Sequence, residues 1–170
     1  MIESLVVAKY VSSILSTDSK LMAIYGGTVQ LYNEGAPHGA GNGPYTVFNI
    51  PAGIDSNTLD GNRILVPGDV NIVTCVQDLG YGAIKAAADR IDAIMTSVVQ
   101  VTFGGIFITK YVRKATVMMS DSTDDIYWYY LGGMYEADIF EYSPPSAGGL
   151  YDPGGAFGDN PLRAPSLPAA

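Results

Sequence analysis

Two segments of the chain carry apolar residues at helical spacing. Over 2–15 these residues are Ile2, Leu5, Val6, Val11, Ile14 and Leu15. Over 81–99 they are Ile84, Ala87, Ala88, Ile91, Ile94, Met95 and Val98, while Lys85, Asp89, Arg90 and Asp92 lie off the stripe. Such a recurrence gathers apolar side chains on one face, so both segments are predicted to be amphipathic helices. Residues 19–25 are predicted to add a further short turn.

Alternating or β-branched and aromatic runs predict the strands. The predicted strands are 28–32, 45–50, 69–79, 101–102, 106–112 and 126–142. The segment 69–79 has the longest alternation and is predicted to be the central strand. Gly104-Gly105 predicts a tight turn or bulge, and Gly132-Gly133 a bend in the last strand.

Three stretches are predicted to lie outside the main strands and helices. The polar segment 51–68 is predicted to be an exposed loop in which 64–66 pairs only locally, and 120–125 a turn. Residues 143–170 hold six of the ten prolines and no strand or helix period. A segment of this composition does not hold one shape by its own contacts, so we expect a neighbouring subunit to hold it.

The predicted fold class is therefore α+β. Residues 1–142 form one domain, with a mixed, mainly antiparallel sheet and both amphipathic helices packed on one face. Residues 143–170 form an extended, Pro/Gly-rich C-terminal arm.

Charge limits the partners of this domain. The net charge is −8 with a pI near 4.3, and the nine basic residues are scattered. Non-specific binding of nucleic acid needs clustered Lys and Arg, so such binding is not expected. An acidic surface does suit a channel through which DNA slides without sticking.

The chain has no expected membrane segment, because its apolar runs are far shorter than the roughly 20 residues that a spanning helix needs. The first residues do not resemble a signal peptide, so we expect the protein to be made and kept in a cytoplasm. The single cysteine, Cys75, allows no internal disulfide and is expected to pack as a small apolar residue. With one histidine, His38, a structural zinc site is not expected.

Two loop motifs invite a catalytic interpretation. The glycine-rich loop 35–43 lacks the Gly-Lys-Ser/Thr ending of a phosphate loop and leads into a strand, so a plain loop is favoured. His38 within it has no nucleophile or orienting acid signalled nearby. Asp121, Asp124 and Asp125 do not match the spacing of a calcium loop, so a solvated turn is favoured.

Two groups on the last predicted strand invite a similar interpretation. Of Glu136, Asp138 and Glu141, the first two share a face and could resemble a carboxylate pair, but such a row on a sheet is more often a solvent face or an interface edge. The aromatic run 127–130 has no interleaved Lys or Arg for base stacking, so core and interface packing is favoured. No catalytic residue, cofactor or metal is predicted.

The order of these elements resembles that of a phage protein family. The features that carry the resemblance are Ser16-Thr17-Asp18 with Leu21, Ala36-Pro37-His38-Gly39, Pro44-Tyr45-Thr46-Val47, the strand 69–79 followed by the helix 83–98, the turn 121–125 and the strand 127–141. Together they are similar to the tail-completion proteins of tailed bacteriophages, also called tail terminators or neck terminators. The resemblance covers roughly residues 2–142.

The resemblance implies a structural protein without catalytic residues. Members form six-fold rings that cap the tail tube, stop its growth and join it to the neck, while DNA passes through the lumen without specific binding. The implied partners are further copies of the chain, as a hexamer, the tail tube protein and neck or head-completion proteins. The implied location is the virion, after assembly in the host cytoplasm. The residues predicted at interfaces are Tyr127, Tyr129, Tyr142, Tyr151 and Phe157.

Other functions fit the same pattern. A head-completion or neck connector protein shares its size and acidity. A small ligand-binding α+β domain is distinguished by a closed pocket with convergent polar groups. A tail-tube subunit is expected to have more strands and fewer long helices.

Overall fold

The computed structural model describes residues 2–37, 40–51, 56–57, 63–123 and 125–141. The helices are α1 (Ile2–Ser16), α2 (Ser19–Ile24) and α3 (Tyr81–Ser97). The strands are β1 (Leu31–Asn33), β2 (Tyr45–Asn49), β3 (Ser56–Asn57), β4 (Arg63–Pro67), β5 (Val70–Gln77), β6 (Val101–Phe103), β7 (Ile106–Ile108), β8 (Val112–Thr123), β9 (Ile126–Glu136) and β10 (Asp138–Glu141). The predicted α+β class is confirmed.

Five strands form the first sheet, in the order β1-β2-β5-β9-β8. Its pairs are antiparallel except β1 with β2. β5 is the middle strand and pairs with β9 from Val70, opposite Tyr135, to Gln77, opposite Trp128. The prediction of a central strand over 69–79 is therefore confirmed.

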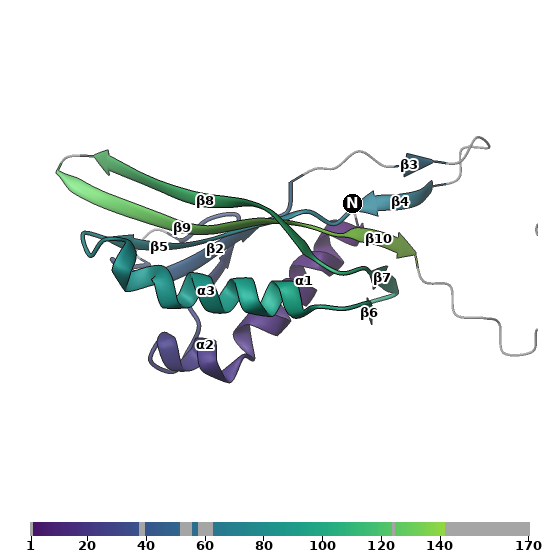
Figure 1. The fold of residues 1–170 in the computed structure, drawn as a ribbon, viewed down its shortest axis with the longest axis horizontal. Coiled ribbons are helices and arrows are strands. Elements are labelled where there is room, and N and C mark those ends of the chain that lie inside the picture. The colour runs from purple at the N-terminus through teal and green to yellow at the C-terminus, as the bar shows by residue number, and fades with distance from the viewer. Residues whose placement is uncertain (1, 38–39, 52–55, 58–62, 124, 142–170) are drawn as a thin grey trace, which may run out of the picture.

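All three helices lie on one face of this sheet (Figure 1). α3 packs on β5 and β9 through its predicted stripe, and α1 buries Val7, Val11 and Leu15 in the same core. The two predicted amphipathic helices and their common face are confirmed. Among the described residues, no helix is long and apolar enough to cross a membrane.

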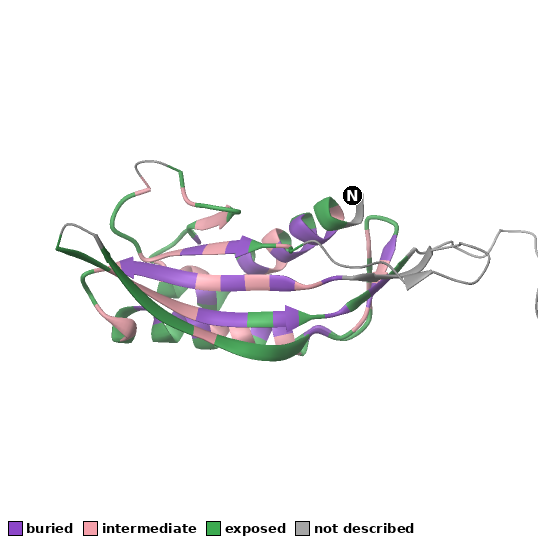
Figure 2. Ribbon diagram, turned by 90° about the horizontal axis from the view of Figure 1, so that it is seen from above, coloured by how far each residue is buried: buried purple, intermediate pink, exposed green. Residues whose placement is uncertain are grey.

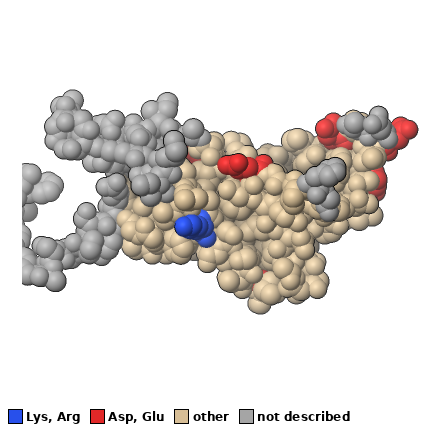
Figure 3. Space-filling model, turned by 180° about the vertical axis from the view of Figure 1, so that it is seen from behind, with Lys and Arg blue, Asp and Glu red and all other residues tan. Residues whose placement is uncertain are grey.

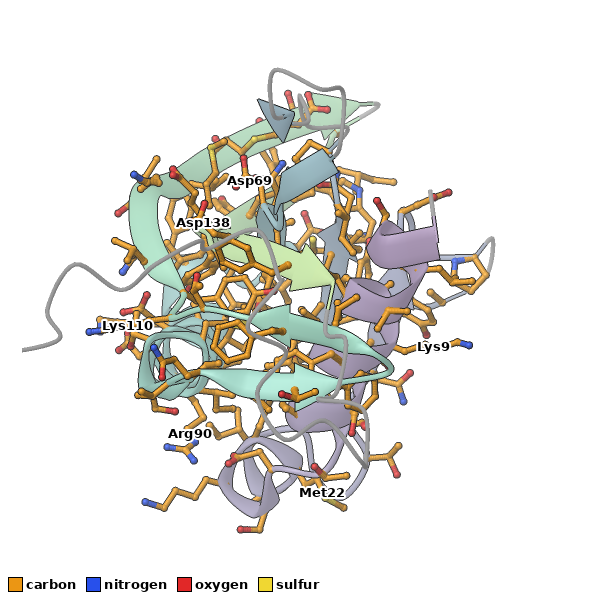
Figure 4. The ribbon with its side chains drawn as sticks, turned by 90° about the vertical axis from the view of Figure 1, so that its right-hand side faces the viewer. Lys9, Met22, Asp69, Arg90, Lys110 and Asp138 are labelled. Atoms are coloured by element: carbon orange, nitrogen blue, oxygen red, sulfur yellow. The ribbon has the colours of Figure 1, made fainter. Side chains whose placement is uncertain are left out.

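Asp18 joins two of these helices. It is the N-cap of α2, where its carboxylate accepts a hydrogen bond from the backbone N–H of Leu21 at 2.8 Å. The Arg90 guanidinium of α3 donates to both oxygens of the same carboxylate, with Nε 2.9 Å from Oδ1. Figure 4 shows Arg90 at the side of the molecule where α2 lies. The Arg90 hydrogen bonds lower the pKa of Asp18 to about 2.

We expect Asp18→Ala to lower the free energy of unfolding by about 1 kcal/mol at neutral pH, because the helix loses its cap. Asp18→Asn keeps an equally good cap and loses only the ion pair, so its effect is smaller. Since folding lowers the pKa of Asp18, its charged form stabilises the fold above about pH 4, and this contribution disappears as the pH falls through about 2. Thermal melts of the wild type and both variants from pH 7 to pH 2 test this. A wild-type advantage over Asp18→Asn that is unchanged at pH 2 contradicts it.

The second sheet is a departure from the single sheet predicted. It has the order β3-β4-β10-β7-β6 and lies at the end opposite the β8–β9 turn (Figure 1). Within 51–68, the exposed-loop prediction is wrong for β4, which pairs with β10 as well as with β3. The reason is that the chain continues from β9 through Ala137 into β10, which offers its edge to Val66. The turn at Gly104-Gly105, with φ of +57° and +82°, is confirmed as the link between β6 and β7.

The strand β8 corrects two sequence predictions. The sequence predicts a turn over 120–125, but β8 continues to Thr123 and the turn includes Asp125, at φ +64°. The strand predicted over 106–112 is in fact β7 and the start of β8. β8 is an edge strand with most side chains exposed, so it has no buried alternation to reveal it. The first strand is also shorter than predicted and begins at Leu31.

Two buried tyrosines differ in how their hydroxyl groups are satisfied. The Tyr135 hydroxyl donates to Asp92 Oδ1 at 3.1 Å, whereas the Tyr111 hydroxyl has no hydrogen-bond partner among the described residues. Tyr111 is fully buried, and burial raises the pKa of its hydroxyl. A buried polar group without a partner costs stability.

We expect Tyr111→Phe to leave stability unchanged or to raise it by up to about 1 kcal/mol, because only an unsatisfied hydroxyl is removed. Tyr135→Phe is the matched control and should lower stability by about 1 kcal/mol, since Asp92 loses a donor. Chemical denaturation of both variants measures the difference. Equal losses in the two variants contradict this account of Tyr111.

Candidate interaction surfaces

The face of the first sheet that points away from the helices carries no described helix. Figure 2 looks onto this face, with the strands in front and the helices behind. Because successive side chains alternate across a strand, the register assigns residues to this open face. They are Tyr32, Tyr45, Val47, Asn49, Asn71, Val73, Cys75, Gln77, Val112, Ala115, Val117, Met119, Asp121, Ile126, Trp128, Tyr130, Gly132, Met134 and Glu136. The charged residues in this set are Asp121, near the β8–β9 turn, and Glu136, at the end of β9.

An aromatic row on the open face takes its side chains from β1, β2 and β9 and passes over β5, which lies between β2 and β9. The ring centroids of Tyr32 and Tyr45 are 5.9 Å apart, and those of Tyr45 and Trp128 are 6.0 Å apart. These rings are half-buried, while Met119 and Met134 farther along the face are 51% and 42% exposed. Aromatic and methionine side chains without charges are the composition of a buried interface core. The open face is therefore a candidate contact surface.

Cys75 lies beneath this row, and its thiol is expected to be unreactive. It is 1% exposed, and burial raises the pKa of its thiol to about 12. Burial also raises the pKa of the neighbouring Tyr45 to about 12. A thiol that stays protonated is a poor nucleophile, so Cys75 packs as predicted.

Two of the predicted interface residues fall within the described chain. Tyr127 and Tyr129 lie two apart on β9, on the side facing the helices rather than on the open face. Tyr129 packs edge-on against Tyr81 at the start of α3, with centroids 5.1 Å apart, while Tyr127 is 51% exposed. Tyr142, Tyr151 and Phe157 lie outside the described residues.

Sequence reasoning missed the open face as a unit. Its aromatic row joins strands distant in sequence, so only the register reveals it. One signal is present in β5, where Val73 and Cys75 are apolar although they alternate with the helix-facing Ile72, Thr74 and Val76. A strand with apolar residues on both faces is typical of a sheet covered on both sides.

A groove of about 320 Å³ lies between α3 and the β8 edge. Its lining residues are Tyr81, Gly82, Lys85, Ala88, Asp89, Arg113, Thr116, Met118, Leu131 and Gly132. We call it the α3–β8 groove. It forms because α3 packs on β5 and β9, so that β8 extends beyond the helix.

The charged groups at the α3–β8 groove pair with one another. Lys85 forms an ion pair with Asp89 one turn along α3. Arg113 Nη1 lies 3.2 Å from Asp92 Oδ2, and its Nη2 donates to the carbonyl oxygen of Gly132 at 3.3 Å. The remaining lining is mainly apolar, through Met118 and Leu131. The groove thus lacks the convergent free polar groups of a small-molecule or catalytic site.

The carboxylates weighed as possible sites in the sequence do not gather into one group among the described residues. Asp121 and Asp125 are exposed near the β8–β9 turn, where Figure 3 shows acidic side chains at one end of the molecule. No group of three or more His, Cys, Asp or Glu residues suited to a metal ion occurs among the described residues. Asp124 and His38 fall in the gaps between the described ranges.

The carboxylates near β10 are divided by the end of β9. Glu136 ends β9 and pairs with Lys114 at 2.8 Å, while Asp138 begins β10 and its backbone N–H donates to Thr109 Oγ1. Figure 4 shows Asp138 and Asp69 on the same side of this end of the molecule. Burial, together with Glu136 and Asp138, raises the pKa of Asp69. The predicted row of Glu136 and Asp138 on one strand is therefore wrong.

Comparison with known proteins identifies the fold. No protein-family model matches the chain, and no curated protein matches it. A solved chain from the virion of a native gene transfer agent particle is similar over 76% of this chain and 91% of its own length, with a TM-score of 0.61 and 18% identity. A second solved protein, which carries no functional description, is similar over 81% of this chain and 96% of its own length, with a TM-score of 0.55 and 15% identity. At these identities the likeness establishes a shared fold.

Proposed function

We propose that this chain is a non-enzymatic structural subunit of a phage-like virion, of the tail-terminator or tail-completion type. It forms a ring at the head-proximal end of the tail, ends the growth of the tube and joins the tail to the neck. Its partners are other copies of itself, the tail tube protein and neck or head-completion proteins.

The observation that carries the proposal is the open face of the first sheet. A half-buried row of Tyr32, Tyr45 and Trp128, continued by exposed methionines, leaves apolar area in contact with water. Exposed apolar area of this kind marks a protein contact surface. A structural subunit that is surrounded by neighbours needs such a surface, whereas an isolated enzyme does not.

The shared fold supports the virion setting. The gene transfer agent chain belongs to a virion, and the similarity extends over nearly its whole length. The resemblance of the sequence to tail-completion proteins rests on other features, namely element order and loop residues. Both lines lead to the same class of structural protein.

A closed ring explains how such a subunit stops a tube. Each copy uses two different surfaces toward its two neighbours, and the rotation closes after a fixed number of copies, six by family analogy. One side of the ring binds the last layer of the tube. The other side does not present the surface that a further tube layer would bind, so the tube stops growing. The net charge of −8 opposes adsorption of DNA as it passes through the lumen. A subunit with this role is located in the virion, after assembly in the host cytoplasm.

A polymerisation assay tests the terminator role. Tail tubes grown with and without the protein are compared for length by electron microscopy. We expect the protein to bind one tube end and to stop elongation there. If tubes grow to the same length and the protein instead binds only neck components, the chain is a neck connector and the terminator role is wrong.

A further inference from the structure

The outer edge of β8 is open and poorly protected. β8 is the last strand of the first sheet, and no described strand pairs with its outer side. Its middle, Ala115–Ser120, carries no charge and no proline, and Met118 and Met119 there are 62% and 51% exposed. Edges without charges or prolines are templates for the addition of another strand.

The α3–β8 groove lies beside this edge on the helix side. Thr116 and Met118 of β8 line it together with Lys85 of α3. A strand added outside β8 would alternate its side chains, so every second one would face this groove. The groove offers an apolar lining with two cationic side chains, Lys85 and Arg113. Each forms an ion pair with an acid of α3, Lys85 with Asp89 and Arg113 with Asp92.

The C-terminal arm provides two segments suited to strand addition. Proline cannot donate to a strand ladder, so its prolines leave two windows, 146–152 and 154–160. Each window has one aromatic residue and one acid. In 154–160, Phe157 and Asp159 are two apart and would share a face, whereas Tyr151 and Asp152 are adjacent and would face opposite sides.

We propose that window 154–160 of a second copy adds along the β8 edge and places Phe157 in the α3–β8 groove. Asp159 then lies on the same side as Phe157 and faces the cationic groups Lys85 and Arg113. The arm of each copy holds the next copy around the ring. This inference rests on the proposed ring and names one contact within it.

The direction of the chain favours a second copy over the arm's own domain. β9 and β10 run away from the β8–β9 turn, so the chain reaches Glu141 heading away from the groove (Figure 1). From Glu141 to Phe157 an extended chain spans up to roughly 50 Å, which is enough to reach an adjacent subunit. To fill its own groove, the arm would have to reverse along the length of the sheet.

Site-specific cross-linking tests the contact. Full-length Met118→Cys and full-length Phe157→Cys, with different tags, are mixed, assembled and oxidised. The native Cys75 does not compete, because it is buried and stays protonated. We expect a disulfide between differently tagged chains, and at least a tenfold loss of yield when Tyr151→Cys replaces Phe157→Cys.

A double variant identifies the donor of the arm. Met118→Cys with Phe157→Cys in one chain is diluted into excess wild-type protein and oxidised. A cross-link within that chain means that the arm fills its own groove, which overturns the proposal. If rings form but no disulfide appears, this inference is wrong, while the proposed ring-forming function stands.

A non-covalent measurement completes the test. We expect Phe157→Ala to raise the concentration for half-assembly at least tenfold and Tyr151→Ala less than twofold. Equal effects, or none, contradict the choice of window. If the wild-type protein forms no oligomer with or without tubes, the proposed function and this inference both fail.

Discussion

Gly132→Ala is expected to cause the largest loss of stability of any substitution proposed for this chain. A Cβ at this position would lie 1.9 Å from the backbone carbonyl oxygen of Ile72, in the paired region of β5 and β9. Neither backbone can yield without breaking the middle of the sheet. We expect a loss of roughly 3 kcal/mol or more in the free energy of unfolding, which lowers the melting temperature by roughly 6–12 °C. Thermal and chemical denaturation measure it.

Gly82→Ala is the matched control. A Cβ at Gly82 in α3 meets no atom within 4 Å, and alanine favours the helix by about 0.5–1 kcal/mol. Its stability should therefore be equal to or above that of the wild type. Similar stability of the two variants would contradict the packing described between β5 and β9.

A charge added to the open face is expected to weaken assembly strongly without unfolding the subunit. Met119→Glu and Met134→Lys lie on this face, where both methionines are more than one third exposed in the isolated chain. The charged side chain stays in water in the folded single subunit, so the fold tolerates it. In an assembly that buries this face, every copy would bury an unpaired charge, and the lost hydration disfavours association. We expect each variant to weaken oligomer formation more than about 100-fold, equivalent to about 2.7 kcal/mol. Sedimentation velocity measures assembly, and circular dichroism checks the fold.

Val99→Glu is the control for the added charge. Val99 is 68% exposed, follows α3 and lies outside the first sheet. We expect this variant to assemble like the wild type. If it loses assembly to the same degree as Met119→Glu, the open face is not the specific contact.

The helices and the central strand are predictable because burial governs their sequences. α3 has one face on the sheet and one in water, and this asymmetry is visible as the stripe that includes Ile84 and Ile91. β5 likewise places Val70 and Ile72 in the core. Where one face is buried and the other is not, local sequence carries the periodicity.

The edge strand β8 and the pairing of β4 in the second sheet are not predictable, for the opposite reason. Most side chains of β8 are exposed to solvent, so its sequence needs no alternation of apolar and polar residues. β4 is defined by pairing with β10, and these strands are far apart in sequence. β10 begins directly after β9 ends at Glu136, and its position determines whether β4 has a partner. The residues near β4 carry no information about this.

The candidate surface is only partly predictable. The aromatic run 127–130 is expected to serve both packing and contacts, and the alternation of β9 divides it between the two faces. Tyr129 packs on Tyr81 beside the helices, while Trp128 joins Tyr45 on the open face. Sequence indicates the right strand, but the pairing of β2 with β5 and of β5 with β9 is needed to assemble the row.

Native mass spectrometry of the purified protein, alone and with tail tubes, tests the central claim most directly. The account predicts either a closed ring or a subunit that becomes a ring at tube ends, with six copies by the family analogy. A monomer that ignores tube ends and has no affinity for neck proteins would contradict the structural role and leave the open face without its proposed partner.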